Sequence, residues 1–547
     1  MQENNNSFFD NFDFFPFESD AAVCNEYGVF LDCKAFESLC YNAFERLSFT
    51  FTKEHLENII KSCLSQDASE NDKYVLSCIL KNAQAASGKK FALCQDTGIA
   101  NIFGWSKGNF FTVEKSESLY NAVSNGTKNL YHNKNLRFST TCPVSFYDEK
   151  DPKNNMPPQI SFFKENCCLA PEPSFLKNSP GDSMNLIFCA KGGGSSNKTV
   201  FFQGTKANLT EKGILDFIKQ KISGFGVSAC PPYTVCIVVG GLSPEQNLLT
   251  LKLATTGAYD TMTYTPNPNG FRDKFLEQQV INIAKNTGFG SQFGGTQFVL
   301  DSIVIRLPRH GASCPISAGV SCCAHRNLKA VITKDGYFLE KTVSEPEKLE
   351  GFEKCVSISN MPENAKSAVL NTDSGMENLL KKLNEFSVGD RILLSGKILI
   401  ARDQAHARWL KLIESGQELP EYTKKYPVFY AGPARTPKGE VTGSIGPTTA
   451  GRMDSYGEIF MKNGASLITL AKGNRSSFWK ECCKNFGGFY LGTPGGIAAL
   501  NASKYVLSQK IIDYEDLGME AVRIVEVKNL PCFLLTDNKG NDFYESL

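Results

Sequence analysis

The sequence has no excess of either charge and no long apolar run. Among its 547 residues, 58 Lys and Arg balance 57 Asp and Glu, which leaves a formal net charge of +1. Such a chain has no bulk attraction for nucleic acid or for an anionic membrane. Its longest apolar stretches, such as 235–239, are far shorter than the ~18 residues that a membrane-spanning helix needs. We therefore expect a soluble globular protein with neither a nucleic-acid nor a membrane partner.

The N-terminus lacks the features of an export signal. Its first twenty residues contain several Asp and Glu but no Lys or Arg, unlike a signal peptide or an Arg-rich transit peptide. The chain has 19 cysteines, an odd number that suits a reducing compartment and buried thiols better than a disulfide framework. We expect a cytoplasmic protein, with a mitochondrion-related organelle as the alternative.

Several short motifs that carry common chemistries are also missing. There is no Cys-x-x-Cys and no His-Glu-x-x-His, which excludes zinc ribbons, thioredoxin-type sites and zincin hydrolases. The glycine-rich segment 191–199 lacks the glycine before lysine of a phosphate-binding loop, and Phe293 replaces the third glycine of a dinucleotide motif. These departures disfavour a nucleotide or NAD enzyme.

Composition and periodicity divide the chain into four parts. Residues 1–22 are rich in Asn, Phe and Asp without periodicity and are expected to form a flexible or loosely docked arm. Residues 23–343 begin with apolar residues at helical spacing between 36 and 86 and continue into strand-like runs at 234–239 and 300–305. They predict a first domain that mixes helices and sheet.

The second half of the chain is separated by a polar segment. Residues 344–366 have few apolar anchors and are the expected linker. Residues 367–547 carry strand-like runs at 392–400, 466–470 and 532–536 and a helical stretch at 402–413. The pattern indicates a two-domain α+β or α/β protein.

Three cysteines differ from the rest because they lie in polar or Gly/Pro-rich loops. Cys94 precedes Gln-Asp-Thr-Gly, Cys230 precedes two prolines, and Cys322 follows Gly-Val-Ser, with Cys314 and Cys323 as competitors for the last position. Three thiolates on a 4Fe-4S cluster would leave one iron open to act as a Lewis acid. By spacing alone, buried structural cysteine is the favoured alternative.

The second half also places cations at sharp turns beside predicted strand ends. Arg402 and Arg452 belong to such turns, as does Lys472 in a Lys-Gly-Asn-Arg segment. Two arginines that each bind a carboxylate in bidentate fashion would suit a small dicarboxylate. Solvated surface arginines are the alternative.

Long motifs along the chain resemble those of the class I, iron–sulfur dependent fumarate hydratases. The resemblance runs from about residue 35 to Leu547, and both halves are present, as in the single-chain two-domain form. The segments that carry it are 93–98, 191–199, 229–233, 306–322, 402–406, 430–437 and 446–454.

The resemblance implies a 4Fe-4S cluster on three of the cysteines. It makes Cys94, Cys230 and Cys322 the ligands, because the family's third ligand follows the loop histidine, here His310, by twelve residues. Cys314 and Cys323 stay structural. His325 departs from the residue that is common at this position.

The resemblance also implies the reaction and the residues around the substrate. The reaction is the reversible hydration of fumarate to (S)-malate, a step of the tricarboxylic acid cycle. The implied catalytic residues are Asp96, Thr448 and His310. Asp96 suits proton transfer to or from the hydroxyl and Thr448 proton transfer at carbon, although these two roles could be exchanged. The implied substrate-binding residues are Gln95, Arg137, Gly194, Arg402, Thr449, Arg452 and Lys472.

The family further implies a homodimer with the active site between two domains. The N-terminal domain would be mainly helical with sheet, and the C-terminal one a swivelling β/β/α domain. Oxygen sensitivity is expected, because an open iron is exposed to oxidants. A related hydro-lyase acting on tartrate or mesaconate is the alternative within this class, and a non-catalytic iron–sulfur sensor is the alternative outside it.

Overall fold

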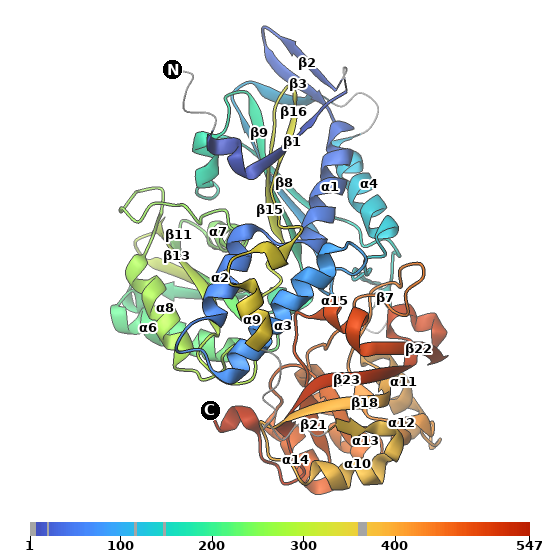
Figure 1. Cartoon of the computed structure of the whole chain (residues 1–547). Helices are drawn as coiled ribbons and strands as arrows, with labels where there is room; N and C mark the ends of the chain where they lie inside the picture. The colour runs from blue at the N-terminus through green and yellow to red at the C-terminus, as the bar shows by residue number, and fades with distance from the viewer. Residues whose placement is uncertain (1–6, 19–20, 114–117, 146–148, 359–368) are drawn as a thin grey trace.

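The computed structural model describes residues 7–18, 21–113, 118–145, 149–358 and 369–547. Its first sheet has six strands in the order β1-β16-β15-β9-β4-β8 and lies at the top of Figure 1. Helices α1 (Ala35–Phe49) and α4 (Leu119–Asn133) pack together beside it, and α1 shares an apolar core with its strands. The strands are β1 (Phe12–Pro16), β4 (Ile99–Lys107), β8 (Gln159–Lys164), β9 (Ser183–Lys191), β15 (Asn327–Ile332) and β16 (Gly336–Glu340).

A second sheet of five strands has the order β10-β14-β11-β13-β12. Helices α6 (Glu211–Phe225) and α8 (Lys274–Lys285) pack against it, and α7 (Pro244–Ala254) contributes to the core between the first two sheets. The strands are β10 (Val200–Thr205), β11 (Tyr233–Gly241), β12 (Phe271–Arg272), β13 (Val299–Arg309) and β14 (Ser313–Ser321).

The third sheet contains the C-terminal part of the chain. Its seven strands have the order β17-β18-β19-β20-β21-β23-β22, and β18 also pairs with β23. Helix α11 (Asp403–Glu414) follows β18 directly. The strands are β17 (Val369–Asn371), β18 (Arg391–Ile400), β19 (Val428–Phe429), β20 (Ile468–Ala471), β21 (Phe489–Gly492), β22 (Val506–Asp513) and β23 (Val522–Thr536).

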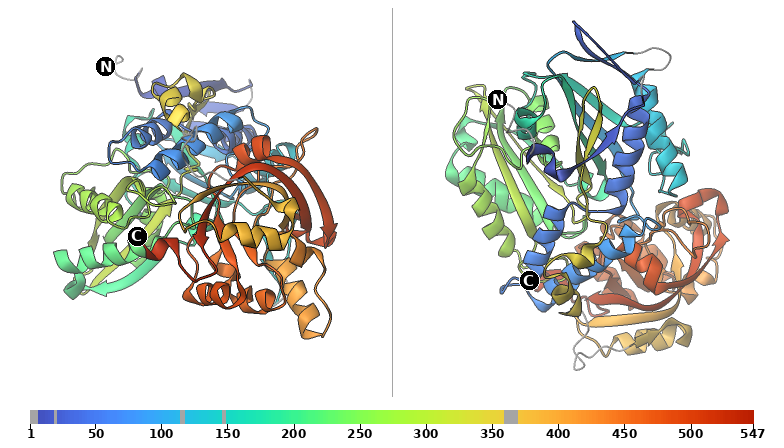
Figure 2. Two further views of the ribbon diagram at one scale, coloured as in Figure 1. Left: turned by 60° about the horizontal axis from the view of Figure 1, so that its bottom comes forward. Right: turned by 45° about the horizontal axis from the view of Figure 1, so that its top comes forward.

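The C-terminal sheet shares one apolar core with helices from the start of the chain. Residues of α2 (Lys53–Cys63), α3 (Glu70–Ser87) and α9 (Phe352–Ile358) belong to the same buried cluster as β18 and β23. The ring of Phe533 stacks on that of Phe293 with centroids 4.0 Å apart. Figure 2 shows the orange and red part against the blue helices from two further directions. The halves of the chain are therefore joined by a common core as well as by the connecting segment.

The mixture of helices and sheets that the sequence predicts is confirmed. Helical spacing between 36 and 86 corresponds to α1, α2 and α3, and the strand-like runs at 234–239 and 300–305 lie in β11 and β13. The region expected to be mainly helical contains two sizeable sheets. Sheet therefore has a larger share of it than expected.

Two segments differ from the sequence-based expectation. Part of the expected flexible arm forms β1, an edge strand on β16, because its alternating aromatic residues find partners such as Tyr337, whose ring stacks on Phe15 at 5.0 Å. The first part of the expected linker is also ordered, since α9 packs on α3. Residues 359–366 of that linker lie outside the described residues.

All 19 cysteines are described and none is in a disulfide; most of them are buried, as predicted. In the part of the chain that the structure describes, no helix has the length and apolar character needed to cross a membrane.

The loop before β13 is held to α3 by one buried carboxylate. Asp72 is fully buried and accepts backbone N–H groups from Ser69 at 3.1 Å, Ser291 at 2.6 Å and Thr296 at 2.8 Å. Its replacement by alanine would leave these buried donors without an acceptor.

We expect Asp72→Ala to lower the free energy of unfolding by about 3 kcal/mol, the cost of several unsatisfied buried donors. Urea titrations of Asp72→Ala and wild-type protein would measure this difference. Glu70→Gln, at an exposed position of the same helix turn, is the control and should change stability by less than ~0.5 kcal/mol. Equal midpoints for Asp72→Ala and the control would contradict the assignment.

Candidate active site between the two halves of the chain

Cys230 and Cys322, two of the three loop cysteines, lie at the same end of two neighbouring strands in the five-stranded sheet. Cys230 precedes β11 and Cys322 follows β14, and these strands are antiparallel neighbours in which Thr234 pairs with Ser321. The backbone N–H of Cys323 donates to the carbonyl of Cys230 at 3.1 Å. Antiparallel pairing thus brings together two loops that are about ninety residues apart in the sequence.

The third cysteine reaches this edge from the loop after α3. The backbone of the preceding residue, Leu93, is fixed on both sides, because its N–H donates to the Ser48 carbonyl at 2.9 Å and its carbonyl accepts Asn82 Nδ2 at 3.0 Å. Burial raises the pKa of the Cys94 thiol, and the nearby Cys322 adds to this rise. The two thiols are therefore within electrostatic range of each other.

A lysine from the C-terminal half contacts the cysteine group directly. Lys472 Nζ lies 2.7 Å from Cys230 Sγ. Burial raises the pKa of Cys230 to about 11, although Lys472 opposes the rise. The pKa of Lys472 is raised to about 12, because its interactions with Cys230, Cys94 and Cys322 outweigh its own burial. One cation thus interacts with all three thiols.

Cys94, Cys230 and Cys322 have the donor type that an iron–sulfur cluster requires. Among the described residues, no three His, Cys, Asp or Glu side chains converge closely enough to ligate one ion. In a cluster each thiolate binds a different iron, so the sulfurs do not need to meet at one point. Their thiolate chemistry and the adjoining cation suit such an anionic group.

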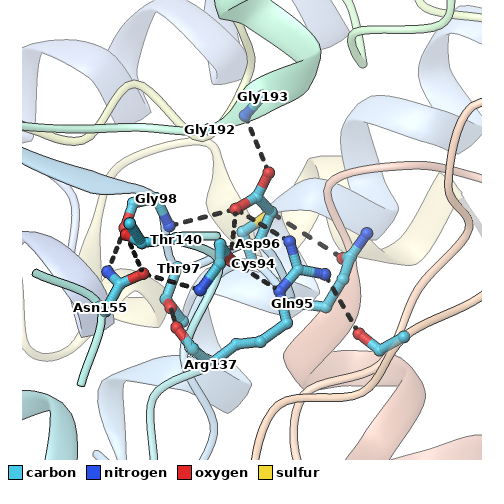
Figure 3. Close-up of polar contacts among 12 residues, drawn as sticks. Cys94, Gln95, Asp96, Thr97, Gly98, Arg137, Thr140, Asn155, Gly192 and Gly193 are labelled. Carbon is cyan, nitrogen blue, oxygen red and sulfur yellow. Dashed lines mark hydrogen bonds and ion pairs between the residues drawn. The ribbon is translucent and has the colours of Figure 1, made fainter. Parts of the chain in front are cut away.

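Asp96, two residues after Cys94, is held tightly by polar contacts, as Figure 3 shows. Its carboxylate forms an ion pair with Arg137 at 3.0 Å and accepts the backbone N–H of Gly193 at 2.9 Å and of Gly98 at 3.2 Å. Burial alone would raise its pKa, but the guanidinium groups of Arg137 and Arg326 and these N–H groups lower it to about 2. Asp96 is therefore an ionised, oriented carboxylate.

The neighbours of Asp96 extend the site towards both halves of the chain. Gln95 is buried and donates from Nε2 to the Pro447 carbonyl at 3.0 Å. Gly194, in the short helix α5 (Gly193–Ser196), packs against the backbone of Ala229, next to Cys230. The glycine-rich segment 191–199 thus lies between Asp96 and Cys230.

The C-terminal half contributes two arginines with acidic partners. Arg402, only 8% exposed, forms an ion pair with Glu520. Asp403 joins the two arginines, because its Oδ2 lies 3.6 Å from Arg402 Nε and 3.2 Å from Arg452 Nη2. The Arg402 Nε is buried and has no hydrogen-bond partner among the residues that the structure describes. A carboxylate ligand would satisfy this donor.

Arg137 connects this arginine group to the N-terminal half. It is 7% exposed and its Nη1 donates to the Gly432 carbonyl at 3.3 Å. The absence of a side chain at Gly432 makes room for Arg402, since a Cβ there would lie 2.5 Å from Arg402 Nη1. Burial lowers the pKa of Arg137, Asp96 raises it, and Arg402 lowers it further, which indicates that the two guanidinium groups face one region.

Thr448 and Thr449 lie beside Lys472 on a short backbone ladder. Thr449 forms a parallel bridge with Lys472, whose N–H donates to the Thr448 carbonyl at 3.1 Å. The Thr448 hydroxyl donates to the Tyr430 carbonyl at 2.9 Å. Its oxygen lone pairs therefore remain available as acceptors.

The structure does not bring His310 to these residues. It is exposed at the tip of the β13–β14 hairpin, where its Nδ1 accepts the N–H of Ala312 at 3.2 Å. Cys322 follows the other end of the nine-residue strand β14, so roughly 30 Å of extended chain separates them. Within one chain, His310 is therefore remote from the cysteines, and its catalytic role stays a prediction.

His325, which departs from the residue that is common at this position in the family, contacts Ser321 and His55. Its Nδ1 lies 2.9 Å from Ser321 Oγ, and its ring stacks on His55 with centroids 4.9 Å apart. His55 Nε2 in turn lies 2.8 Å from the Cys323 carbonyl. Both histidines therefore contact and stabilise the loop that contains Cys322 and Cys323.

Sequence reasoning missed three residues of the site. Gln292 bridges the halves, because its amide bonds to the Pro231 carbonyl at 2.9 Å and to both backbone groups of Gly495. Glu520 forms an ion pair with Arg402, which lies 118 residues earlier in the chain. The charge of Arg326 interacts with Cys94, Cys322 and Asp96. Only Arg326 had a sequence signal, its position four residues after Cys322.

Comparison with known protein families gives two matches that together cover most of the chain. A family described as "Fumarate hydratase (Fumerase)" matches residues 37–331, and one described as "Fumarase C-terminus" matches residues 338–547.

Individual proteins are similar over nearly the same length. Fumarate hydratase 1, mitochondrial, of Leishmania major is 41% identical over 520 residues, which cover 94% of this chain and 91% of that protein. The aerobic class I fumarate hydratase of Escherichia coli K12 is 40% identical over 522 residues, 94% of this chain and 90% of that protein. A putative L(+)-tartrate dehydratase subunit beta of Methanocaldococcus jannaschii is 34% identical over 171 residues, 30% of this chain and 88% of that protein.

Proposed function

Because the chain belongs to the class I fumarate hydratase family, in its single-chain form, we propose that it hydrates fumarate reversibly to (S)-malate. The family makes it a hydro-lyase. The observation that supports the proposal best is the contact of 2.7 Å between Lys472 and Cys230. It joins the cysteine group of one half to the cation group of the other.

We assign the cofactor to the three cysteines that adjoin Asp96 and Lys472. Cys94, Cys230 and Cys322 would hold a 4Fe-4S cluster. When bound, such a cluster with one iron free of protein ligands supplies Lewis-acid polarisation of substrate oxygens.

The arginines suit the carboxylates of a small diacid. Arg402 and Arg452 offer guanidinium groups whose fork geometry matches a carboxylate, and Arg137 adds a third charge from the opposite side. Their pairing with Asp403 and Glu520 fixes their orientation before substrate binds. Thr449, Gly194 and Gln95 would line the remaining contacts with the substrate.

Two residues would move the protons of the reaction. Asp96 lies on the cysteine side, and we assign it the proton exchanged at the substrate hydroxyl. Thr448 lies on the cation side, and we assign it the proton exchanged at carbon. Lys472, in the adjoining bridge, would stabilise the Thr448 alkoxide and the charge that grows on the substrate in the transition state.

We expect a homodimer, as the family resemblance implies, and His310 gives this expectation a structural consequence. At its hairpin tip, His310 could approach a substrate only in the site of a second copy. Light scattering of the purified protein would give the oligomeric state, and His310→Ala would test whether the hairpin contributes to turnover.

The proposed activity can be tested by metal removal. We expect anaerobically reconstituted protein to hydrate fumarate and to contain iron and sulfide, and chelation of its iron to abolish turnover, because the Lewis acid contributes several kcal/mol to transition-state stabilisation. The test measures absorbance loss of fumarate before chelation, after it and after anaerobic reconstitution. Full activity in iron-free protein would overturn the proposal.

Tartrate or mesaconate is the second candidate substrate. The similarity of 30% of the chain to a protein named as a putative tartrate dehydratase subunit beta favours this alternative. An added hydroxyl or methyl group changes transition-state binding by only about 1–3 kcal/mol in such pockets. Comparing kcat/KM on fumarate, tartrate and mesaconate would rank the three. An intact cluster without turnover of any of them would indicate a sensor.

A further inference from the structure

Gln292 is a buried carboxamide that binds both halves of the chain. It lies in the loop between α8 and β13 and is only 2% exposed. Its Nε2 donates to the Pro231 carbonyl at 2.9 Å and to the Gly495 carbonyl at 3.0 Å, and its Oε1 accepts the Gly495 N–H at 2.7 Å. The side chain therefore bonds only to backbone atoms, one of them on the residue after Cys230 and the others in the C-terminal half.

The backbone at Gln292 is held in an unfavourable conformation by its surroundings. Its φ angle is 122°, a value that residues with a side chain rarely adopt and that persists only where neighbouring contacts enforce it. The preceding residue, Ser291, donates its N–H to the buried Asp72 carboxylate at 2.6 Å, and the Gln292 carbonyl accepts the Tyr544 hydroxyl at 2.9 Å. These contacts fix the direction in which the Gln292 side chain points.

Gly495 lies against the sulfur that Lys472 contacts. A Cβ at Gly495 would overlap Cys230 Sγ and would lie 3.1 Å from Lys472 Cδ. The backbone that Gln292 binds therefore forms one wall around the contact between Cys230 and Lys472. A shift of this backbone would change the space available to both side chains, because packed interiors have few voids.

A second buried carboxamide, Asn82, fixes the following part of the C-terminal half to another cysteine loop. Its Oδ1 accepts the N–H groups of Ala499 at 2.9 Å and of Leu500 at 3.0 Å. Its Nδ2 donates at 3.0 Å to the carbonyl of Leu93, the residue before Cys94. One stretch of the C-terminal half therefore binds two cysteine loops, each through a buried amide side chain.

We propose that Gln292 is a positioning residue that sets the place of Cys230 relative to Cys94. It does so by binding the Cys230 loop to the stretch of the C-terminal half that Asn82 also binds. The inference rests on the proposed function, in which the two cysteines hold one cluster, and it assigns Gln292 no contact with substrate or cluster. Loss of its three hydrogen bonds would let the Cys230 loop open locally while the domain stays folded.

The test uses Gln292→Met, which keeps the length of the side chain but removes its hydrogen bonds. Gln246→Met is the matched control, because Gln246 is 8% exposed and also bridges two segments: it accepts the Leu242 N–H at 2.7 Å and donates to the Cys168 carbonyl at 3.1 Å. Leu242 follows the opposite end of β11 from Cys230. Mass spectrometry measures the alkylation rate of each cysteine in cluster-free protein, and a chelator measures iron release from anaerobically reconstituted protein.

We expect Cys230 to be alkylated about tenfold faster in Gln292→Met than in wild type, because local opening becomes easier. Cys94 should change by less than about twofold, since Asn82 still holds its loop. Iron release from the reconstituted variant should be about tenfold faster. The control Gln246→Met should match wild type in both measurements. Equal acceleration at the two cysteines, or none at Cys230, would overturn the inference.

Tyr544→Phe repeats the test if Gln292→Met does not fold, because it removes only the hydrogen bond to the Gln292 carbonyl. We expect about threefold faster alkylation of Cys230 and the same contrast with Cys94. Absence of that contrast would overturn the inference. A wild-type protein that binds no cluster would refute the proposed function, whereas the alkylation rates of cluster-free protein test the role of Gln292 in either case.

Discussion

Cys94→Ser is expected to lose its cluster and to lower fumarate hydration by at least about 10³-fold, because a Lewis acid worth several kcal/mol disappears with it. Serine keeps the size of the side chain but not the thiolate. The backbone hydrogen bonds of Leu93 that fix this loop involve no Cys94 side-chain atom, so the fold should persist. Iron, sulfide and hydratase activity are measured after anaerobic reconstitution, with circular dichroism as the check on folding.

Adjacent cysteines provide a matched control for the same experiment. Cys322→Ser should behave like Cys94→Ser, whereas Cys323→Ala should retain iron, because Cys323 meets Cys230 through its backbone N–H. The Cys323 sulfur instead packs towards Gly496. Loss of iron from Cys323→Ala together with an active Cys322→Ser would reverse the ligand assignment.

Thr448→Val should lower kcat by about 10²–10⁴-fold, the usual contribution of a positioned proton-transfer group, with little change in KM. Valine preserves the shape of the side chain but removes the hydroxyl group, which donates to the Tyr430 backbone carbonyl. Thr448→Ser restores a hydroxyl and should recover most of the activity. Steady-state kinetics on both variants would measure the difference.

Isotope exchange separates the role of Thr448 from that of Asp96. In deuterated water, Thr448→Val should lose exchange of the malate carbon-bound proton together with hydration. Asp96→Asn should lose hydration but retain that exchange, because we place Asp96 on the hydroxyl side. The opposite pattern would show that the two residues have exchanged roles.

Local signals in the sequence were enough for the elements and for the cysteine ligands as a hypothesis. Helical spacing identified α1 to α3, and β-branched runs identified β11 and β13, because apolar periodicity reflects which face of an element is buried. The N-terminal arm was missed as a strand, since its partner β16 lies more than three hundred residues later. Pairing over such a separation leaves no local pattern.

Motifs, periodicity and cysteine context are local properties of the chain, and they were sufficient to identify the family, the mixed helix and sheet content and the free thiols. Which charged groups contact one another, in contrast, depends on the three-dimensional fold. The tertiary structure brings Lys472 to Cys230, pairs Glu520 with Arg402 and places His310 at the far end of β14 from Cys322. Strand direction and the common core of the two halves set these distances, and neither can be read from the spacing of residues along the chain.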